Sequence, residues 1–180
     1  MTNSLPFSKS KFAALGLSLL GLLPCLALAQ VNGSFNAAAT VVQPLTITST
    51  STLNFGSFVA GATAGSVIVS SSGTYTRSAT GGVKLVNSNN GSFSTINVSG
   101  AVGTNYWINT LPADVKLINS TGGTTMAISS FTTNLPSGTA RASITDSGNG
   151  SFQIGGTLEV GINQPSGIYS AVIPITVNYE

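Results

Sequence analysis

The sequence predicts an all-β protein, a single antiparallel β-sandwich that follows a cleaved N-terminal export signal. Two observations carry this prediction. Short runs rich in Val, Ile, Thr, Phe and Tyr recur along residues 30–180 with turn-forming residues between them, and no stretch of this part has the period of a helix. The first 29 residues, in contrast, form a basic and then apolar leader.

The leader has the three parts of a secretory signal peptide. Two lysines precede an apolar run over residues 12–29, which ends in the small-residue sequence Ala-Leu-Ala. The run is short for a membrane anchor, which is the competing interpretation, so we expect residues 1–29 to be removed before Gln30. Cleavage would also remove Cys25, the one cysteine of the chain, and leave no thiol for a disulfide.

Residues 30–180 are expected to form one domain, because their number suffices for one core and hardly for two. The predicted strands lie near residues 35–47, 53–58, 66–70, 83–86, 93–98, 106–111, 115–118, 126–131, 140–145, 152–161 and 168–179. Turn-forming pairs separate several of them: Asn90-Gly91, Gly122-Gly123 and Asn149-Gly150, the last of which is typical of a hairpin turn.

The charge pattern indicates a surface that packs against other protein. Without Lys9 and Lys11 of the leader, the chain has four basic and four acidic residues, so the formal net charge of residues 30–180 is zero. This composition provides neither a basic patch for nucleic acid nor a polybasic membrane anchor, and the mature chain has no predicted membrane span. A surface of Ser, Thr, Asn and Gly without net repulsion favours self-association.

The residue types needed for common catalytic and metal sites are missing. The chain has no histidine, and the mature part has no cysteine, so the usual triads and zinc sites cannot be built. The segment 146–150 faintly resembles a calcium loop, but it has one carboxylate, and a hairpin turn is the favoured interpretation. We therefore predict that the protein is not an enzyme and has no cofactor or metal.

The C-terminal residues 168–180 predict a long amphipathic strand. Its apolar face consists of Tyr169, Ala171, Ile173, Ile175, Val177 and Tyr179. Pro174 has no amide hydrogen, which places the strand at a sheet edge. An exposed apolar edge strand is normally covered, in a polymerising subunit by a chaperone first and by a neighbour afterwards.

A second alternating segment, residues 31–41, directly follows the predicted cleavage site. Its apolar or small positions are Val31, Gly33, Phe35, Ala37, Ala39 and Val41. Such a strand can be the first strand of its own sandwich, or it can be donated to another subunit. The pattern alone does not distinguish pairing within the chain from pairing between chains.

Several motifs carry a resemblance to a known family. They are the run 53–58, the glycine pairs at 81–82 and 155–156, and the ending from Gln164-Pro165 through Tyr179. With these, the chain resembles the secreted bacterial family called domain of unknown function 4402. More distantly it is similar to spore-coat-protein-U-like and chaperone–usher pilins, which share an early Phe-Gly, a Gly-x-Tyr before the last strand and a penultimate tyrosine.

The pilin resemblance implies a fold and a function. The fold would be an incomplete immunoglobulin-like sandwich, capped in the periplasm by a chaperone strand and in the fibre by the N-terminal strand of the next subunit. Val31, Phe35, Ala37 and Ala39 would then be donor residues, with Gly33 at a position that prefers a small side chain. The protein would be a structural subunit of a surface filament, secreted through the periplasm and an outer-membrane usher to the cell surface or extracellular fimbriae.

The alternative function is a self-contained secreted or surface sandwich that binds a ligand, such as a lectin-like adhesin. Trp107, Tyr106 and Tyr75 could stack on sugar rings beside Asn and Asp side chains. Against this, the strand-like run Tyr106-Trp107-Ile108 predicts that Trp107 lies in the core. We expect the core position for Trp107.

Overall fold

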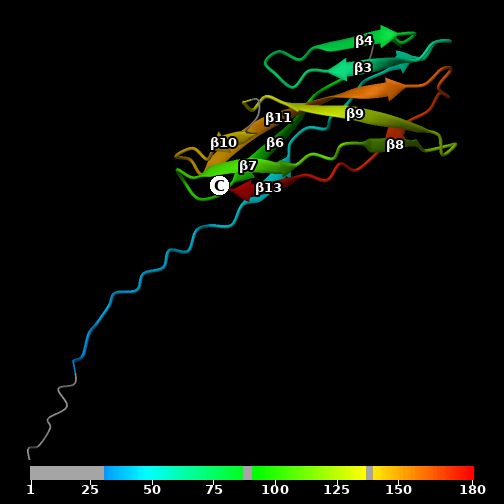
Figure 1. The fold of residues 1–180 in the computed structure, drawn as a ribbon. Coiled ribbons are helices and arrows are strands. Elements are labelled where there is room, and N and C mark those ends of the chain that lie inside the picture. The colour runs from blue at the N-terminus through cyan, green and yellow to red at the C-terminus, as the bar shows by residue number, and fades with distance from the viewer. Residues whose placement is uncertain (1–30, 87–90, 137–139) are drawn as a thin grey trace, which may run out of the picture. The chain divides into compact units, whose positions relative to one another are not determined.

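A computed structural model describes residues 31–86, 91–136 and 140–180. The chain divides into two compact units, residues 1–39 and 40–180, and each is described by itself. The signal peptide predicted over residues 1–29 lies outside the described residues. The described part of the chain is all-β, with no helix, and its strands pair antiparallel (Figure 1).

The strands have the following bounds: β1 Thr46–Ser49, β2 Phe58–Val59, β3 Gly65–Val69, β4 Arg77–Gly81, β5 Lys84–Leu85, β6 Ser94–Ser99, β7 Asn105–Thr110, β8 Val115–Asn119, β9 Thr125–Thr133, β10 Arg141–Ser143, β11 Asn149–Val160, β12 Tyr169–Ser170 and β13 Thr176–Tyr179. They form one large and two small sheets.

The large sheet is organised around β11. Its strand order is β1-β6-β11-β9-β8-β12, and β3, with β4 beside it, also pairs with β11. The first half of β11 pairs with β6 and its second half with β3, while β9 lies along the opposite edge. An irregularity between Thr157 and Leu158 shifts the register to β9, and bulges of this kind increase the bend of a strand. The antiparallel strands curl into a half-barrel (Figure 1).

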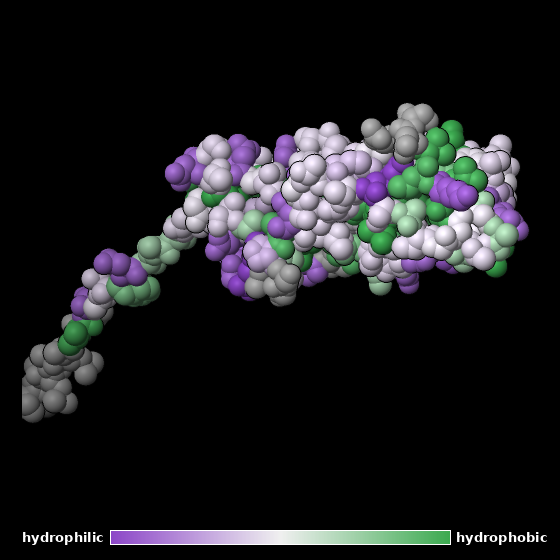
Figure 2. All heavy atoms as spheres, turned by 90° about the horizontal axis from the view of Figure 1, so that it is seen from above, coloured by the Kyte–Doolittle hydropathy of each residue, from purple (hydrophilic) through white to green (hydrophobic). Residues whose placement is uncertain are grey.

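The two small sheets close the large one over two core clusters. The sheet β10-β7-β13 covers the first cluster, which consists of Ile96, Val98, Tyr106, Ile108, Ile144, Phe152 and Ile154. Beside the pair β2-β5 lies the second cluster, which consists of Phe55, Val67, Val69, Val83, Val115, Met126, Ile128, Leu158 and Val160. On the face drawn in Figure 2 most of the surface is near-white, and the strongly apolar residues gather toward one end.

The predicted strands agree with the structure through the middle of the chain and differ at its start. Instead of a strand over residues 35–47, residues 31–45 belong to no strand, and β1 begins at Thr46. The predicted strand 53–58 is reduced to a bridge between Asn54 and Ser92 followed by the short β2. Strand β4 was missed because it is polar and mostly not buried, so no alternation marks it.

Two further differences concern turns and the C-terminus. The hairpin turn expected at Asn149-Gly150 lies earlier, at residues 146–148, because Gly148 supplies the positive φ of 77° and its amide donates to the Thr145 carbonyl. Asn149 and Gly150 instead begin β11. The predicted strand 168–179 consists of β12 and β13, which pair with different sheets. Asn90 lies outside the described residues.

Candidate binding groove

Two adjoining cavities lie between the beginning and the end of the unit formed by residues 40–180. The wide cavity, of about 620 Å³, lies between residues 53–60 and 164–169. The narrow cavity, of about 350 Å³, lies between residues 47–53 and 171–175. Leu53 lines both cavities, so they adjoin along the seam between the first and the last segment of this unit, and we call the two cavities together the groove.

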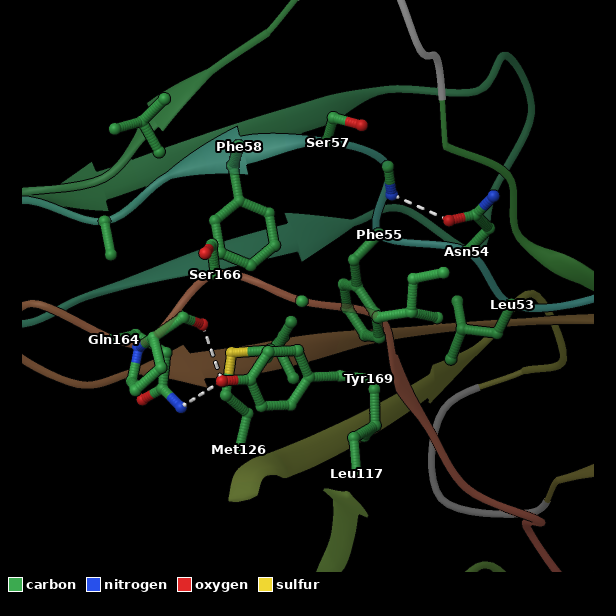
Figure 3. Close-up of a pocket in the computed structure, with 17 residues that line it drawn as sticks. Leu53, Asn54, Phe55, Ser57, Phe58, Leu117, Met126, Gln164, Ser166 and Tyr169 are labelled. Atoms are coloured by element: carbon green, nitrogen blue, oxygen red, sulfur yellow. Dashed lines mark hydrogen bonds between the residues drawn. The ribbon is translucent and has the colours of Figure 1, made fainter. Parts of the chain in front are cut away.

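The wide cavity has an apolar floor and a polar rim. Figure 3 shows the rings of Phe58 and Tyr169 from the two segments, with Met126 and Leu117 beside the Tyr169 ring, on its side away from Phe58. Met126 is buried, and Leu117, Phe58 and Tyr169 pack against the second core cluster. The floor of the cavity is therefore a part of the core that is open on one side.

Side-chain hydrogen bonds supplement a short strand pairing in the first wall of the wide cavity, where β2 pairs with β5 and Asn54 forms a bridge with Ser92. The Gly56 amide donates to Asn54 Oδ1 at 2.8 Å, and Gly56 has a φ of 69°, which suits glycine (Figure 3). The Arg77 guanidinium donates to the carbonyls of Phe55 and Val86 at 3.0 Å each. This segment is consequently fixed without a full complement of pairing strands.

Tyr169 fixes the second wall. Its hydroxyl donates to the Pro165 carbonyl at 2.7 Å, accepts from Gln164 Nε2 at 3.0 Å and lies 3.0 Å from Thr124 Oγ1 (Figure 3). Burial raises the pKa of Tyr169, but hydrogen bonds with Thr124, Gln164 and Asn119 together lower it by more, so the pKa lies below the ordinary value. The phenol thus closes the loop 164–169 as a hydrogen-bonded unit.

The narrow cavity lies between the edge strand β1 and a C-terminal segment that belongs to no strand. Its lining includes Ile96 and Ile154 from the large sheet and Ile173 and Ile175 from the C-terminal segment. On one side stands β1, the terminal strand in the order of the large sheet, which pairs with β6. On the other side stand residues 171–175, which belong to no strand.

The C-terminal residues predicted as an edge strand lie along this groove and beyond it. Tyr169 lines the wide cavity, and Ile173 and Ile175 line the narrow one. Val177 and Tyr179 continue in β13, at the edge of the three-stranded sheet, and pack against the first core cluster. Between the two strands the chain changes from one sheet to the other at residues 171–175, where Pro174 has no amide to continue a ladder.

Tyr179 joins the two ends of this unit. Its hydroxyl donates to the Gln43 carbonyl at 2.6 Å and accepts from the Ala101 amide at 2.7 Å. Leu45 packs against the same core cluster as Tyr179. The chain is therefore fixed at residues 43–45, immediately before β1 and the narrow cavity.

The candidate donor residues lie in the N-terminal tail, which we define as residues 31–42. The tail belongs to no strand, and all its residues are exposed. The large apolar side chains are almost fully accessible: Val31 is 90% exposed, Phe35 91% and Val41 96%. Gly33, Ala37 and Ala39 lie between them in the exposed part of the chain. The alternating apolar positions are thus available to a partner.

The three aromatic residues considered for sugar binding do not form one platform. Tyr106 is fully buried, and burial raises the pKa of its phenol. Trp107 is half-buried and lies between two buried neighbours on β7, so the expectation that it lies in the core is wrong. It faces outward, with Arg141 and Asn178 opposite it on the adjacent strands. Tyr75 packs against the other core cluster.

The sequence pattern did not identify the groove itself. It marked the two apolar faces at the chain ends, but the grouping of Leu53 and Phe58 with Leu117 and Met126 depends on tertiary packing. The useful signal was Pro174, because a proline in an alternating run shows where strand pairing stops. In the part of the chain that is described, no cluster of three His, Cys, Asp or Glu residues forms a metal site. The same residues include no apolar helix of membrane-spanning length.

Comparison with curated proteins and with solved structures gives no match to this chain. A family model matches residues 45–179, a range that begins two residues after Gln43 and ends at Tyr179. The match covers the groove and both its walls and leaves out the N-terminal tail. This protein belongs to the family described as Domain of unknown function (DUF4402).

Proposed function

We propose that the protein is a structural subunit of a bacterial surface filament and that β-strand complementation joins its subunits. Its domain is an incomplete immunoglobulin-like sandwich, similar to that of pilins, which lacks one strand. The signal peptide directs the chain to the periplasm. There a chaperone covers the groove, an outer-membrane usher exports the subunit, and in the filament a strand from a neighbour replaces the chaperone.

The single observation that carries this proposal is the open groove between the first and last segments of the unit 40–180. Its floor consists of buried core residues such as Met126, and its apolar lining includes the partly exposed side chains of Ile47, Leu53 and Phe58, which a further strand would cover. One wall, residues 171–175, belongs to no strand. An added strand supplies both missing parts, since its main chain pairs with an edge and its alternate side chains fill pockets.

The N-terminal tail has the chemistry of such a strand. Its apolar or small residues alternate with polar ones up to Asn36, and Ala38 and Val42 interrupt the pattern further on; the tail is exposed and lies outside the residues that the family model matches. Covering Phe35 or Val41 completely contributes about 1.5–3 kcal/mol for each side chain. The near-zero charge of residues 30–180 adds no repulsion between copies.

The test compares two acidic substitutions in the tail of the exported, otherwise intact chain. Phe35→Asp places a carboxylate on the alternating apolar face, whereas Asn36→Asp places it on the opposite face. Both positions are exposed, so neither substitution should alter the folded domain. We expect Phe35→Asp to reduce filaments and multimers at least tenfold and Asn36→Asp to leave them unchanged, measured by size-exclusion chromatography and negative-stain microscopy.

The competing function, a self-contained ligand-binding sandwich, predicts another result. The intact protein would then purify as a monomer at high concentration without a chaperone, and neither substitution would change its size. That outcome would overturn the filament assignment. Equal multimer populations in the two variants would show that the alternating face of the tail does not join the subunits.

A further inference from the structure

The path of the chain beside the groove indicates whether the missing strand comes from the same chain or from a second copy. This inference rests on the proposed function, in which the groove accepts the N-terminal tail. Each chain has one groove and one tail, so the tail could fold back into its own groove or enter that of a second copy. Fully extended, residues 31–42 span about 40 Å at about 3.3 Å per residue, which is long enough for a strand in either arrangement.

The tail leaves the domain at the narrow end of the groove. The Tyr179 hydroxyl holds the Gln43 carbonyl at 2.6 Å, Leu45 is packed in the core, and Ile47 already lines the narrow cavity. To fill its own groove, the tail would have to reverse direction at residues 43–45 and run antiparallel to residues 47–60. Self-complementation therefore requires a tight hairpin at this point.

Residues 43 and 44 oppose such a hairpin. The two-residue turns that most often join antiparallel strands need a positive φ at their first central residue. Pro44 is locked at a φ near −65°, and Gln43, as the residue before proline, is confined to extended conformations. The Gln43 carbonyl would in addition have to give up its hydrogen bond to Tyr179, which also accepts from Ala101. Reversal thus breaks the contact that joins the two ends of the domain.

We propose that Tyr179, Gln43 and Pro44 form a latch that prevents self-complementation, so that the groove is filled by residues 31–42 of a second copy. Residues 43–45 are fixed directly before Ile47, which lines the narrow cavity, so the donor's domain lies beyond the wide end. The donated tail then runs parallel to residues 47–60 and antiparallel to residues 164–175. The self-inserted tail would run in the opposite direction, which makes the two arrangements distinguishable.

The first experiment removes the latch in the exported chain. Replacing Gln43-Pro44 by Asn-Gly (Q43N/P44G) installs the preferred tight-turn sequence, and Tyr179→Phe removes the hydroxyl while retaining the ring. Gln43→Ala is the matched control, because it keeps both the proline and the main-chain carbonyl. We expect the ratio of monomer to multimer to rise at least tenfold in Q43N/P44G, to rise less in Tyr179→Phe and to stay unchanged in Gln43→Ala.

Whether the tail of the monomers is protected or exposed shows if self-complementation is the reason that multimers are lost. If the latch acts as proposed, Q43N/P44G monomers keep a strand-type circular dichroism spectrum and their tails resist limited proteolysis, because the tail fills its own groove. If the wild type and Q43N/P44G form multimers in equal amounts, the latch does not prevent self-complementation. That result would overturn the latch and leave the proposed function intact. A monomeric wild type whose tail is readily cleaved would instead overturn the proposed function.

The second experiment reads the direction of the bound strand. Residues 30–180 contain no cysteine, so paired substitutions report on proximity without background. Ser57 lines the wide cavity and Thr48 the narrow one. Under mild oxidation, Val41→Cys with Ser57→Cys should give a ladder of covalent multimers, and Val41→Cys with Thr48→Cys should give at most one tenth as much. The reverse preference, or a disulfide within single chains, would overturn the inferred direction.

Discussion

Gly155 allows the backbone of β11 to pass close to the backbone at the end of β3. A Cβ atom added at Gly155 would lie 2.3 Å from the Val69 carbonyl oxygen and 2.7 Å from the Ser71 amide nitrogen. Both are backbone atoms, so the contact cannot be relieved by a change of rotamer. Gly155 therefore determines how β11 passes the end of β3, and this crossing lies within the large sheet.

We expect Gly155→Ala to destabilise the domain by about 1–3 kcal/mol, because the added methyl group overpacks a backbone crossing. Gly122→Ala is the matched control, since a Cβ there meets nothing within 4 Å and Gly122 has no positive φ. Its effect should stay within about 0.5 kcal/mol. Urea unfolding of the two variants measures the difference, and equal midpoints would contradict the packing at Gly155.

Trp107 shows what the sequence could not predict at the scale of a single residue. The alternation in Tyr106-Trp107-Ile108 predicted a strand correctly, and β7 includes all three residues. Alternation requires that Trp107 and its two neighbours face opposite sides, but it does not say which side is the interior. The strand-like run led to the prediction that Trp107 lies in the core, whereas the structure buries Tyr106 and Ile108. Which face of β7 is buried depends on the sheet that packs against it, and the sequence of β7 alone does not specify that sheet.

At the scale of elements, β13 depends on the alternation of its two faces. Val177 packs against the first core cluster, whereas its neighbour Thr176, across a register irregularity, is exposed. We expect Val177→Asp to place an unpaired carboxylate in this cluster and to destabilise the domain by at least about 2 kcal/mol. Thr176→Asp should change stability by less than about 0.5 kcal/mol.

The measurement is the amount of folded protein recovered after export, followed by thermal unfolding. Export itself should be equal for the two variants, because both keep the same leader. Equal recovery of Val177→Asp and Thr176→Asp would show that this face of β13 does not contribute to the core.

The elements at the two chain ends were the least predictable. Five residues of the apolar face predicted over 168–179 pack against the core clusters, whereas Ala171 is exposed. Pro174 marked where strand pairing stops, but the change of partner from β8 to β7 is a tertiary property that the alternation does not contain. The tail also has apolar or small residues at every second position from Val31 to Val41, yet it belongs to no strand. Alternation records that a segment suits a half-buried sheet surface and says nothing about which chain provides the partner.

At the scale of the whole molecule, charge should contribute little to association. The groove is lined mainly by apolar side chains, and the formal charges of residues 30–180 cancel. We therefore expect the multimer population to change less than twofold between about 0.05 and 1 M NaCl, because salt screens charges and leaves apolar burial and main-chain pairing in place. Sedimentation velocity at the two salt concentrations tests this, and dissociation in high salt would show that ion pairs join the subunits.

The location of Tyr179 at one end of the groove has a consequence for growth. Any linear series of such chains, whatever its length, keeps one unfilled groove at its first member and one unplaced tail at its last. The two extremities of the filament that we propose would therefore differ chemically: one would expose the apolar groove, and the other would expose the peptide of residues 31–42. In such a filament, the apolar extremity would be closed by a separate protein with a donor strand, or avoided by a first member whose domain is already complete.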